Sequence, residues 1–264
     1  MAIAFDAATD GNTVTSTSLT YSHTVTGSNP FLVVGTLGST TTDKISGVTY
    51  NGVAMTKLNS YHIDTTDRWL SAWYLANPAT GAHNVVVTSS SSDFIASSAA
   101  SYTGVSAVVD SSATSTNTTS TGDLPNATTT VKDNSWHIMV GGLASGTPTA
   151  GTSTTRRVLT TGGNMAIFDG NIAITPAGSN TINMTRTGGS NAGYALIGLS
   201  IGLPAIVAVA ETATLTETVS AAKGKSSTTA ETATLTETVS STAPTPTWNK
   251  QAKSSNSWSN QSKS

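Results

Sequence analysis

Short runs of β-branched and aromatic residues recur along residues 1–203, and clusters of Gly, Asn, Asp, Ser and Pro separate them. Apolar and polar residues alternate in many of these runs, whereas no segment keeps a helical period over three turns. The runs recur roughly every 10 to 15 residues, which favours a sandwich or jelly roll over a βαβ fold. We therefore expect an all-β fold: an antiparallel, jelly-roll-like β-sandwich over residues 1–203, followed by an extended, repeat-containing C-terminal tail.

The pattern predicts individual strands and turns. Tyr50-Asn51-Gly52-Val53 places Asn-Gly between two runs, which is the strongest short signal for a hairpin, and residues 77–81 predict a wider turn. Residues 89–92 and 111–121 are rich in hydroxyl groups and are expected to be loops. The predicted strands are residues 3–7, 13–26, 31–37, 45–50, 53–58, 69–75, 83–88, 95–102, 127–131, 135–143, 155–159, 165–174, 181–185 and 194–201.

Composition excludes several kinds of site. The chain has no Cys, which removes disulfides, thiolate metal sites and a cysteine nucleophile. A net charge of −2 argues against an electrostatic nucleic-acid binder, and no apolar stretch is long enough to predict a membrane-spanning helix. The four His are too far apart for a metal-ligand motif. We expect no metal, no cofactor and no contact with nucleic acid or membrane.

The sequence predicts a protein that is not an enzyme, because no catalytic constellation stands out. Abundant Ser does not identify a nucleophile, and no pair of carboxylates is singled out for glycan hydrolysis, which is the weakest of the alternatives. Trp69 and Trp73 share strand parity and face the same side of one strand. If exposed, they form a glycan-stacking pair; if buried, they belong to the core of the sandwich.

The chain starts with MAIAFDAATDG, which has no basic segment and no long apolar segment, so we expect no secretory signal. Yet Thr and Ser supply 50 and 37 of the 264 residues and charged residues only 10%, a composition that resembles proteins working outside cells. A virion protein satisfies both observations, because it is made in the cytoplasm and released by lysis. Unconventional export and cleavage from a precursor are the alternatives. The expected location is a virion or an extracellular surface assembly.

Three segments carry a resemblance to a known group. They read ISGVTYNGVAMTKL from Ile45, RWLSAWYLANPATGAHNVVVT from Arg68 and AASYTGV from Ala99. In this order they resemble a module of tailed-phage virion proteins, such as capsid decoration and tail fibre proteins, and of related bacterial surface proteins. The resemblance implies a jelly-roll-like β-sandwich with a structural or adhesive role, and it supplies no catalytic residues.

Charge marks a boundary near Leu203 and Pro204, because all four Glu of the chain lie beyond it. We divide the chain into a β-sandwich domain of residues 1–203, a Thr-rich linker of residues 204–243 and a terminal segment of residues 244–264. The linker contains AETATLTETVS twice, starting at Ala210 and at Ala230. Thr occupies one face of each copy if it is extended. The copies form either a disordered tether or strands that add to the sheet edge of a neighbour. In the second case the apolar contacts come from Leu215, Val219, Leu235 and Val239.

The terminal segment contains W-x-x-Q-x-K-S twice, starting at Trp248 and at Trp258. Each Trp could anchor in a pocket of a partner subunit while Gln and Lys bond around its rim. The alternative is a short exposed hairpin in which the two Trp pack together. The predicted partner-binding residues of this segment are Trp248, Gln251, Lys253, Trp258, Gln261 and Lys263.

These observations predict a non-enzymatic structural component of an extracellular assembly, foremost a phage virion protein acting as a decoration, fibre or minor structural subunit. Its partners would be other copies of itself or other virion subunits, bound through the tail. Two alternatives stay open. One is a carbohydrate-binding adhesin module of a receptor-binding fibre, with cell-surface glycan as its ligand. The other is a subunit of a cellular surface filament.

Overall fold

A computed structural model describes residues 2–39, 41–63, 67–117, 124–189 and 193–204. The chain divides into two units, Met1–Val209 and Ala210–Ser264. The described residues all belong to the first unit, and both pairs of tail repeats lie outside them. Every pairing between the described strands is antiparallel, which confirms the predicted all-β class. Within these ranges there is no helix with the length and hydropathy needed to cross a membrane.

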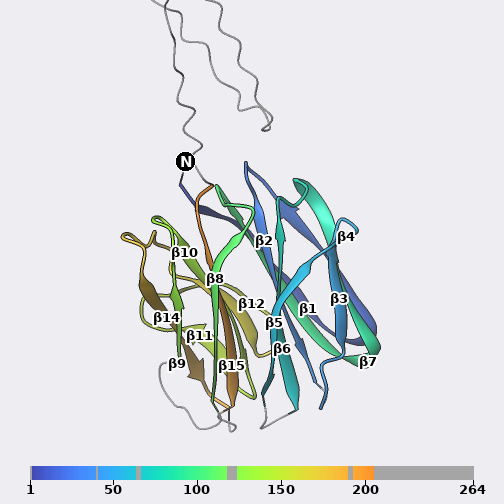
Figure 1. The fold of residues 1–264 in the computed structure, drawn as a ribbon. Helices are drawn as coiled ribbons and strands as arrows, with labels where there is room; N and C mark the ends of the chain where they lie inside the picture. Colours follow the sequence, from blue (N-terminus) through green and yellow to red (C-terminus); the bar gives the residue numbers. More distant parts are fainter. Residues whose placement is uncertain (1, 40, 64–66, 118–123, 190–192, 205–264) are drawn as a thin grey trace, which may run out of the picture. The chain divides into compact units, whose positions relative to one another are not determined.

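The strands fall into an early and a late group along the chain (Figure 1). The early strands are β1 (Ala4–Val25), β2 (Phe31–Gly38), β3 (Ile45–Tyr50), β4 (Val53–Ala54), β5 (Thr56–Ile63), β6 (Arg68–Ala76) and β7 (Gly81–Thr103). The late strands are β8 (Val109–Asn117), β9 (Leu124–Thr129), β10 (Trp136–Leu143), β11 (Thr147–Ala150), β12 (Thr155–Leu159), β13 (Met165–Asp169), β14 (Ser179–Thr187) and β15 (Tyr194–Ile201).

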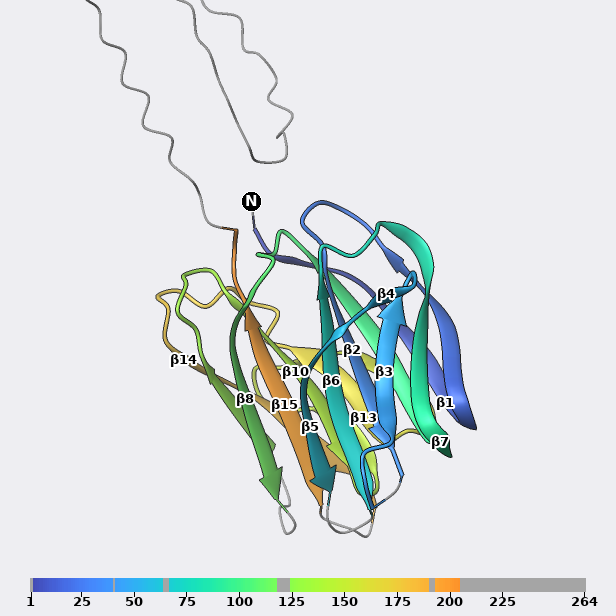
Figure 2. The same cartoon turned by 45° about the vertical axis from the view of Figure 1, so that its right-hand side comes forward.

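The early strands form one seven-stranded sheet that folds over on itself. Strands β1 and β7 pair along almost their whole length and curve together, as Figures 1 and 2 show. The other edge of β7 changes partner at this bend, because residues 85–89 pair with β3 and residues 95–102 pair with β2. The sheet thus supplies two layers, and a hydrophobic core that includes Val34, Tyr50 and Val87 lies between them.

The late strands form two sheets, ordered β12-β13-β10-β15-β8 and β11-β14-β9. A second core, which includes Met139, Phe168 and Met184, fills the space between these two sheets. The largest core lies between the five-stranded sheet and the layer that contains β2 and β6. The sandwich therefore has four β layers with three apolar cores between them.

The stacking of layers explains the longest apolar runs in the sequence. Every residue of β2, β10 and β15 is buried, because a core covers each face of these central strands. Such strands read as continuous apolar runs, whereas strands with one wet face alternate. β9, at a sheet edge, alternates strictly between buried and exposed residues.

Two of the predicted loops are wrong. Residues 89–92 lie inside the continuous strand β7, at its bend, and residues 111–117 belong to β8, which pairs with β15. The backbone ladder to β15 holds residues 111–117, and Thr suits an extended backbone even where nothing apolar is buried. Residues 89–92 fall where the pairing of β7 with β1 shifts register, between Thr88 and Asp93. The remaining residues of the second predicted loop, 118–121, lie outside the described residues.

The predicted hairpin is confirmed. Asn51 and Gly52 have φ values of 49° and 76°, as the tight turn between β3 and β4 requires. The wider turn predicted at residues 77–81 connects β6 to β7, and both of its ends, Asn77 and Gly81, have positive φ.

Candidate functional site

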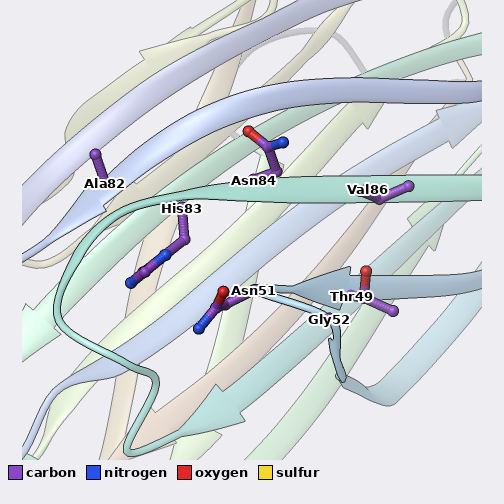
Figure 3. A pocket seen from close by; sticks show the side chains of 7 residues that line it. All are labelled: Thr49, Asn51, Gly52, Ala82, His83, Asn84 and Val86. Carbon is purple, nitrogen blue, oxygen red and sulfur yellow. The ribbon is translucent and has the colours of Figure 1, made fainter.

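A shallow depression lies on the face of the outer layer formed by β3 and the first half of β7 (Figure 3). The hairpin turn lines one side, and the start of β7 lines the other. The backbone N–H of Asn51 donates to the Asn84 carbonyl at 3.0 Å, which fixes the turn beside β7. The lining residues are Thr49, Asn51, Gly52, Ala82, His83, Asn84 and Val86.

The buried ring of Tyr50 supports this depression from below. Its hydroxyl donates to the Gly81 carbonyl at 3.0 Å and approaches the His23 carbonyl at 3.3 Å. The ring of His83 meets the Tyr50 ring edge-on, with 5.6 Å between centroids. His83 Nε2 lies 3.1 Å from the Thr80 carbonyl, which can only accept, so Nε2 carries the proton.

The chemistry of the depression is that of neutral hydrogen bonding. Its lining contains amide, hydroxyl and imidazole groups and no carboxylate, ammonium or guanidinium group. Such a surface can bind hydroxyl or amide groups of a ligand. His83 has no serine, cysteine or carboxylate among these neighbours that would make it part of a nucleophile and base pair.

A second cluster contains the residue types of a hydrolase triad. Ser101 Oγ donates to Asp6 Oδ2 at 2.7 Å, and His23 Nε2 lies 3.1 Å from the same Oγ. Because Ser101 gives its proton to the carboxylate, it must accept from His23 Nε2–H. The imidazole therefore presents a proton, not a lone pair, to the serine. A catalytic triad needs the opposite arrangement, with the carboxylate on the histidine.

The environment of this cluster supports a structural role. Both Ser101 and His23 are buried, and Thr9 Oγ1 lies 2.8 Å from His23 Nδ1. Burial lowers the pKa of His23 to about 4, so the ring is neutral at physiological pH. Partial burial raises the pKa of Asp6, but hydrogen bonds from Thr26 and Ser101 outweigh this effect and bring it below the ordinary value.

A third cluster centres on His137 in β10. Its Nε2 lies 3.0 Å from Asn126 Oδ1 and its Nδ1 lies 3.2 Å from Asn180 Oδ1. Burial lowers the pKa of His137 to about 4, and hydrogen bonds from the ring to acceptors of Asn180 only partly oppose this shift. The ring joins β10 to β9 and β14, so it connects the two late sheets.

The fourth cluster is an ion pair between the buried Asp169 and the partly exposed Arg157. Arg157 Nε lies 2.6 Å from Asp169 Oδ2 and Nη2 lies 3.0 Å from Oδ1, which is a bidentate arrangement. The Tyr102 hydroxyl donates to the same carboxylate at 3.0 Å. Burial raises the pKa of Tyr102 well above its ordinary value, so the hydroxyl stays a donor. The Arg157 guanidinium also lies over the Phe5 ring, 4.3 Å from its centroid.

Trp69 and Trp73, the predicted stacking pair, occupy different environments. Trp73 is 5% exposed, donates Nε1–H to Thr36 Oγ1 at 3.2 Å and lies under the Lys57 ammonium, 4.7 Å from the ring centroid. Trp69 is partly exposed and stacks on His62 at 5.0 Å. Trp73 thus belongs to a core, which leaves only part of Trp69 accessible to a ligand.

The other predicted site residues, from Leu215 to Lys263, lie outside the described residues. Sequence reasoning did not identify the depression, although its Asn-Gly turn was visible, because nothing in the sequence shows that the start of β7 pairs with this hairpin. It also missed the Asp169 cluster, whose two partners come from different strands.

Among the described residues, no three His, Asp or Glu side chains gather closely enough to hold a metal ion. Comparisons with protein families, curated proteins and solved structures found no match to the chain.

Proposed function

We propose that the chain is a non-enzymatic structural component of an extracellular assembly, foremost a phage virion protein that acts as a decoration, fibre or minor structural subunit. In this proposal the body is a jelly-roll-like building block and the C-terminal tail docks on neighbouring subunits. The observation that carries it is the combination of a β body of four layers with a tail in which two peptide motifs each occur twice.

The buried polar side chains of the body support a structural role, because they form hydrogen bonds between strands. His23, His137 and Asp169 each bond to side chains of other strands. The bonds of His23 and His137, and the bond from Tyr102 to Asp169, join different layers, and buried hydrogen-bonded networks of this kind favour one arrangement of the layers. A building block in an assembly needs such a fixed shape, whereas an active site needs at least one reactive group open to substrate.

The tail supports the docking role through its repetition. Two copies of AETATLTETVS, each alternating strictly, suit addition to two sheet edges, where backbone hydrogen bonds supply affinity and alternate side chains supply register. Two copies of W-x-x-Q-x-K-S suit two equivalent pockets. Linked pairs of weak sites bind more tightly than single sites, because the second contact forms at high effective concentration.

The proposal is tested by comparing the full chain with residues 1–204. Light scattering and negative-stain microscopy should show oligomers or binding to virion subunits only for the full chain. In the full chain, Trp248→Ala with Trp258→Ala should abolish assembly, while Ser255→Ala with Ser257→Ala, which changes the tail between the two motifs, should preserve it. Equal assembly by all four proteins would refute the role of the tail. Homopolymers formed without other virion proteins would favour the surface filament.

A second candidate function, an adhesin module that binds glycan, is favoured by the depression of Figure 3. Its neutral amide and hydroxyl groups match the hydrogen-bonding needs of sugar hydroxyls. A glycan array with the labelled full chain should then give hits that Asn84→Ala removes. Ser90→Ala, an exposed change on β7 outside the depression, is the matched control. An array without hits would leave the assembly role as the better proposal.

A further inference from the structure

We propose that residues 2–105 and 106–204 are two copies of one β module, and that each copy binds the other through the same face, about an approximate two-fold axis. Strand order is the first observation. The early strands run β5-β6-β2-β7-β1 in one layer, and the late strands run β12-β13-β10-β15-β8 in the layer that faces it. In the outer layers, β3-β7-β1 corresponds to β11-β14-β9. The long strands β1 and β7 are each divided in the second copy, into β8 with β9 and β14 with β15.

The residue registers of the two copies agree. Phe31 pairs with Tyr102 in the first copy, and Trp136 pairs with Ile201 at the corresponding place in the second. From these two pairs onward, the strands of both copies advance in step, so each later pair of β2 and β7 has a counterpart in β10 and β15. The pair Gly35–Ser98, for example, corresponds to Val140–Ile197. The same agreement holds between the β2–β6 and β10–β13 pairs.

The irregularities of the strands also coincide. The edge strand β5 shifts register between Lys57 and Asn59, opposite Ala72. The edge strand β12 shifts between Arg156 and Val158, opposite the residue that corresponds to Ala72. Bulges are built for particular positions and are not a general consequence of sheet pairing. Their coincidence therefore indicates a shared module, not two independent sheets.

An aspartate marks another shared bulge. β1 shifts register between Phe5 and Ala7, which leaves Asp6 unpaired, and β8 leaves Asp110 unpaired in the same way. Asp6 accepts hydrogen bonds from the Thr26 backbone N–H at 2.9 Å and from Ser101 Oγ at 2.7 Å.

Asp110 makes the same two contacts in the second copy. It accepts from the Val131 backbone N–H at 2.9 Å and from Ser200 Oγ at 3.3 Å. The offsets that align the strands place Val131 at the position of Thr26 and Ser200 at that of Ser101. Each carboxylate thus binds the residue that follows an outer-layer strand, Thr26 or Val131, to an inner-layer strand, β7 or β15. This shared contact involves side chains as well as backbone.

The cores follow the same division. The core between the layers of the first copy contains Val34, Trp73 and Val87, and the core of the second contains their counterparts Met139, Phe168 and Met184. The third core has members from both copies. It is therefore the interface between modules.

Corresponding residues meet each other across this interface, as they must near a two-fold axis. Gly35 corresponds to Val140, and a Cβ added at Gly35 would lie 2.7 Å from Val140 Cγ1. Leu37 corresponds to Gly142, and a Cβ added at Gly142 would lie 3.5 Å from Leu37 Cδ1. In each pair one partner is large and the other is Gly. Two identical modules would place two large groups, or none, at each contact.

The ends of the modules meet at one place. Gly104, at the end of the first copy, packs directly against the Ala2 carbonyl at its start. The Ser106 N–H, at the start of the second copy, donates to the Gly202 carbonyl near its end at 2.7 Å. A short connection can therefore join the copies without disturbing either, which is what fusion of a paired module requires.

The test exchanges residues across the inferred axis in the full chain. Gly35→Val alone should lower the thermal midpoint by about 5 °C or more through overpacking, and Val140→Gly alone should lower it by leaving a cavity. Together, the two changes move the Val side chain of this contact from position 140 to position 35. The double variant should recover most of the loss.

The matched control is a contact between residues that do not correspond. A Cβ at Gly141 would lie 2.6 Å from Met184 Sδ, within the core of the second copy alone. Gly141→Met with Met184→Gly should recover nothing, because the two surroundings differ. Exchange variants that are no more stable than the sum of their single changes would overturn the proposal, and so would equal recovery in the control.

A cleavage experiment keeps the proposal testable if the exchange variants do not fold. A protease site is inserted between Ser106 and Ala107 of the full chain, and a control chain carries it between Pro78 and Ala79, inside the first copy. After cutting, unfolding in urea and removal of urea, the fragments cut at the module boundary should reassemble into one particle by size-exclusion chromatography. The fragments of the control should recover to a much smaller extent. Equal recovery, or none at the boundary, would contradict two modules that recognise each other.

Discussion

Lowering the pH from 7.5 to 5.0 should destabilise the body, because two buried histidines must stay neutral in the folded state. The pKa of His23 and that of His137 are each lowered to about 4 by burial, against an ordinary value near 6.5. Between these values the unfolded chain binds a proton at each ring and the folded chain does not. The free energy of unfolding therefore rises with pH in this range and falls as the pH drops from about 6.5 towards 4.

The size of the effect follows from the two shifts. Over the interval from pH 7.5 to 5.0, each histidine should cost about 2 kcal/mol of stability, which gives about 4 kcal/mol for both. This is a large part of the 5 to 15 kcal/mol that roughly describes domain stability. Asp6 does not interfere, because its pKa lies below an ordinary value that is already under pH 5.

Urea unfolding of the full chain, followed by tryptophan fluorescence at both pH values, measures this loss. The slope of the free energy with urea should not change between them. His23→Gln and His137→Gln should each remove about half of the pH dependence, because an amide keeps hydrogen-bonding groups at the site and does not titrate. If the double variant loses as much stability as the wild type between pH 7.5 and 5.0, the reasoning from buried neutral rings is wrong.

Three further perturbations follow from the clusters. Asp169→Asn should cost about 1.5 to 3 kcal/mol in urea unfolding, because it removes the charged acceptor of Arg157 and leaves that guanidinium with the Asn171 amide oxygen. Restoration by adding Arg157→Leu would confirm this cause, and a cost below about 0.5 kcal/mol would contradict it. Gly52→Ala should cost about 1 to 2 kcal/mol of stability through backbone strain. Gly52 has a φ of +76° and nothing lies within 4 Å of an added Cβ, so no clash contributes. An unchanged urea midpoint would exclude that strain. Trp73→Ala should lower the free energy of unfolding by about 3 to 5 kcal/mol. Lys57→Ala, which removes the ammonium above the same ring, should lower it by about 1 kcal/mol or less. Similar costs for the two substitutions would show that the ring is not part of the core.

The sequence allowed the strands to be predicted better than their connections. Predicted strands at residues 31–37 and 194–201 coincide with β2 and β15 to within a residue, because continuous apolar runs are a strong signal. Residues 3–7 and 13–26 were expected as separate strands, yet they form the single strand β1. Asp10-Gly11-Asn12 between them marks a register shift with Asn12 at φ 66°, not a reversal of the chain.

The same ambiguity affects β7. Polar residues with small side chains permit both a bend in a continuous strand and a turn between two strands, because both need a backbone that leaves the regular ladder. Only the partner strands decide between these outcomes, and their identity is not a local property. The depression beside Asn84 likewise depends on the pairing of β7 with β3, so the sequence could not indicate it.

The repetition of the module was hidden for a different reason. Asp6 and Asp110 keep their task, but most corresponding positions carry different residues. Some of these differences are required by packing, since Gly35 and Val140 touch each other and cannot both be large or both be small. Once two copies are fused in one chain, the two residues of each contact across the axis can change independently. Pairing a large residue with Gly then packs better than pairing two identical residues.

The ion pair of Asp169 extends this argument to polar groups. Asp169 corresponds to Tyr74, whose ring stacks on Phe31 at 5.6 Å, so one side of the axis has a buried carboxylate where the other has an aromatic pair. The Asp169 carboxylate accepts from the Tyr102 hydroxyl of the other copy. A pair made of two second copies would lack that donor, because Ile201 stands there at the position of Tyr102. The two copies have thus diverged so that each fits the other better than it fits a copy of itself.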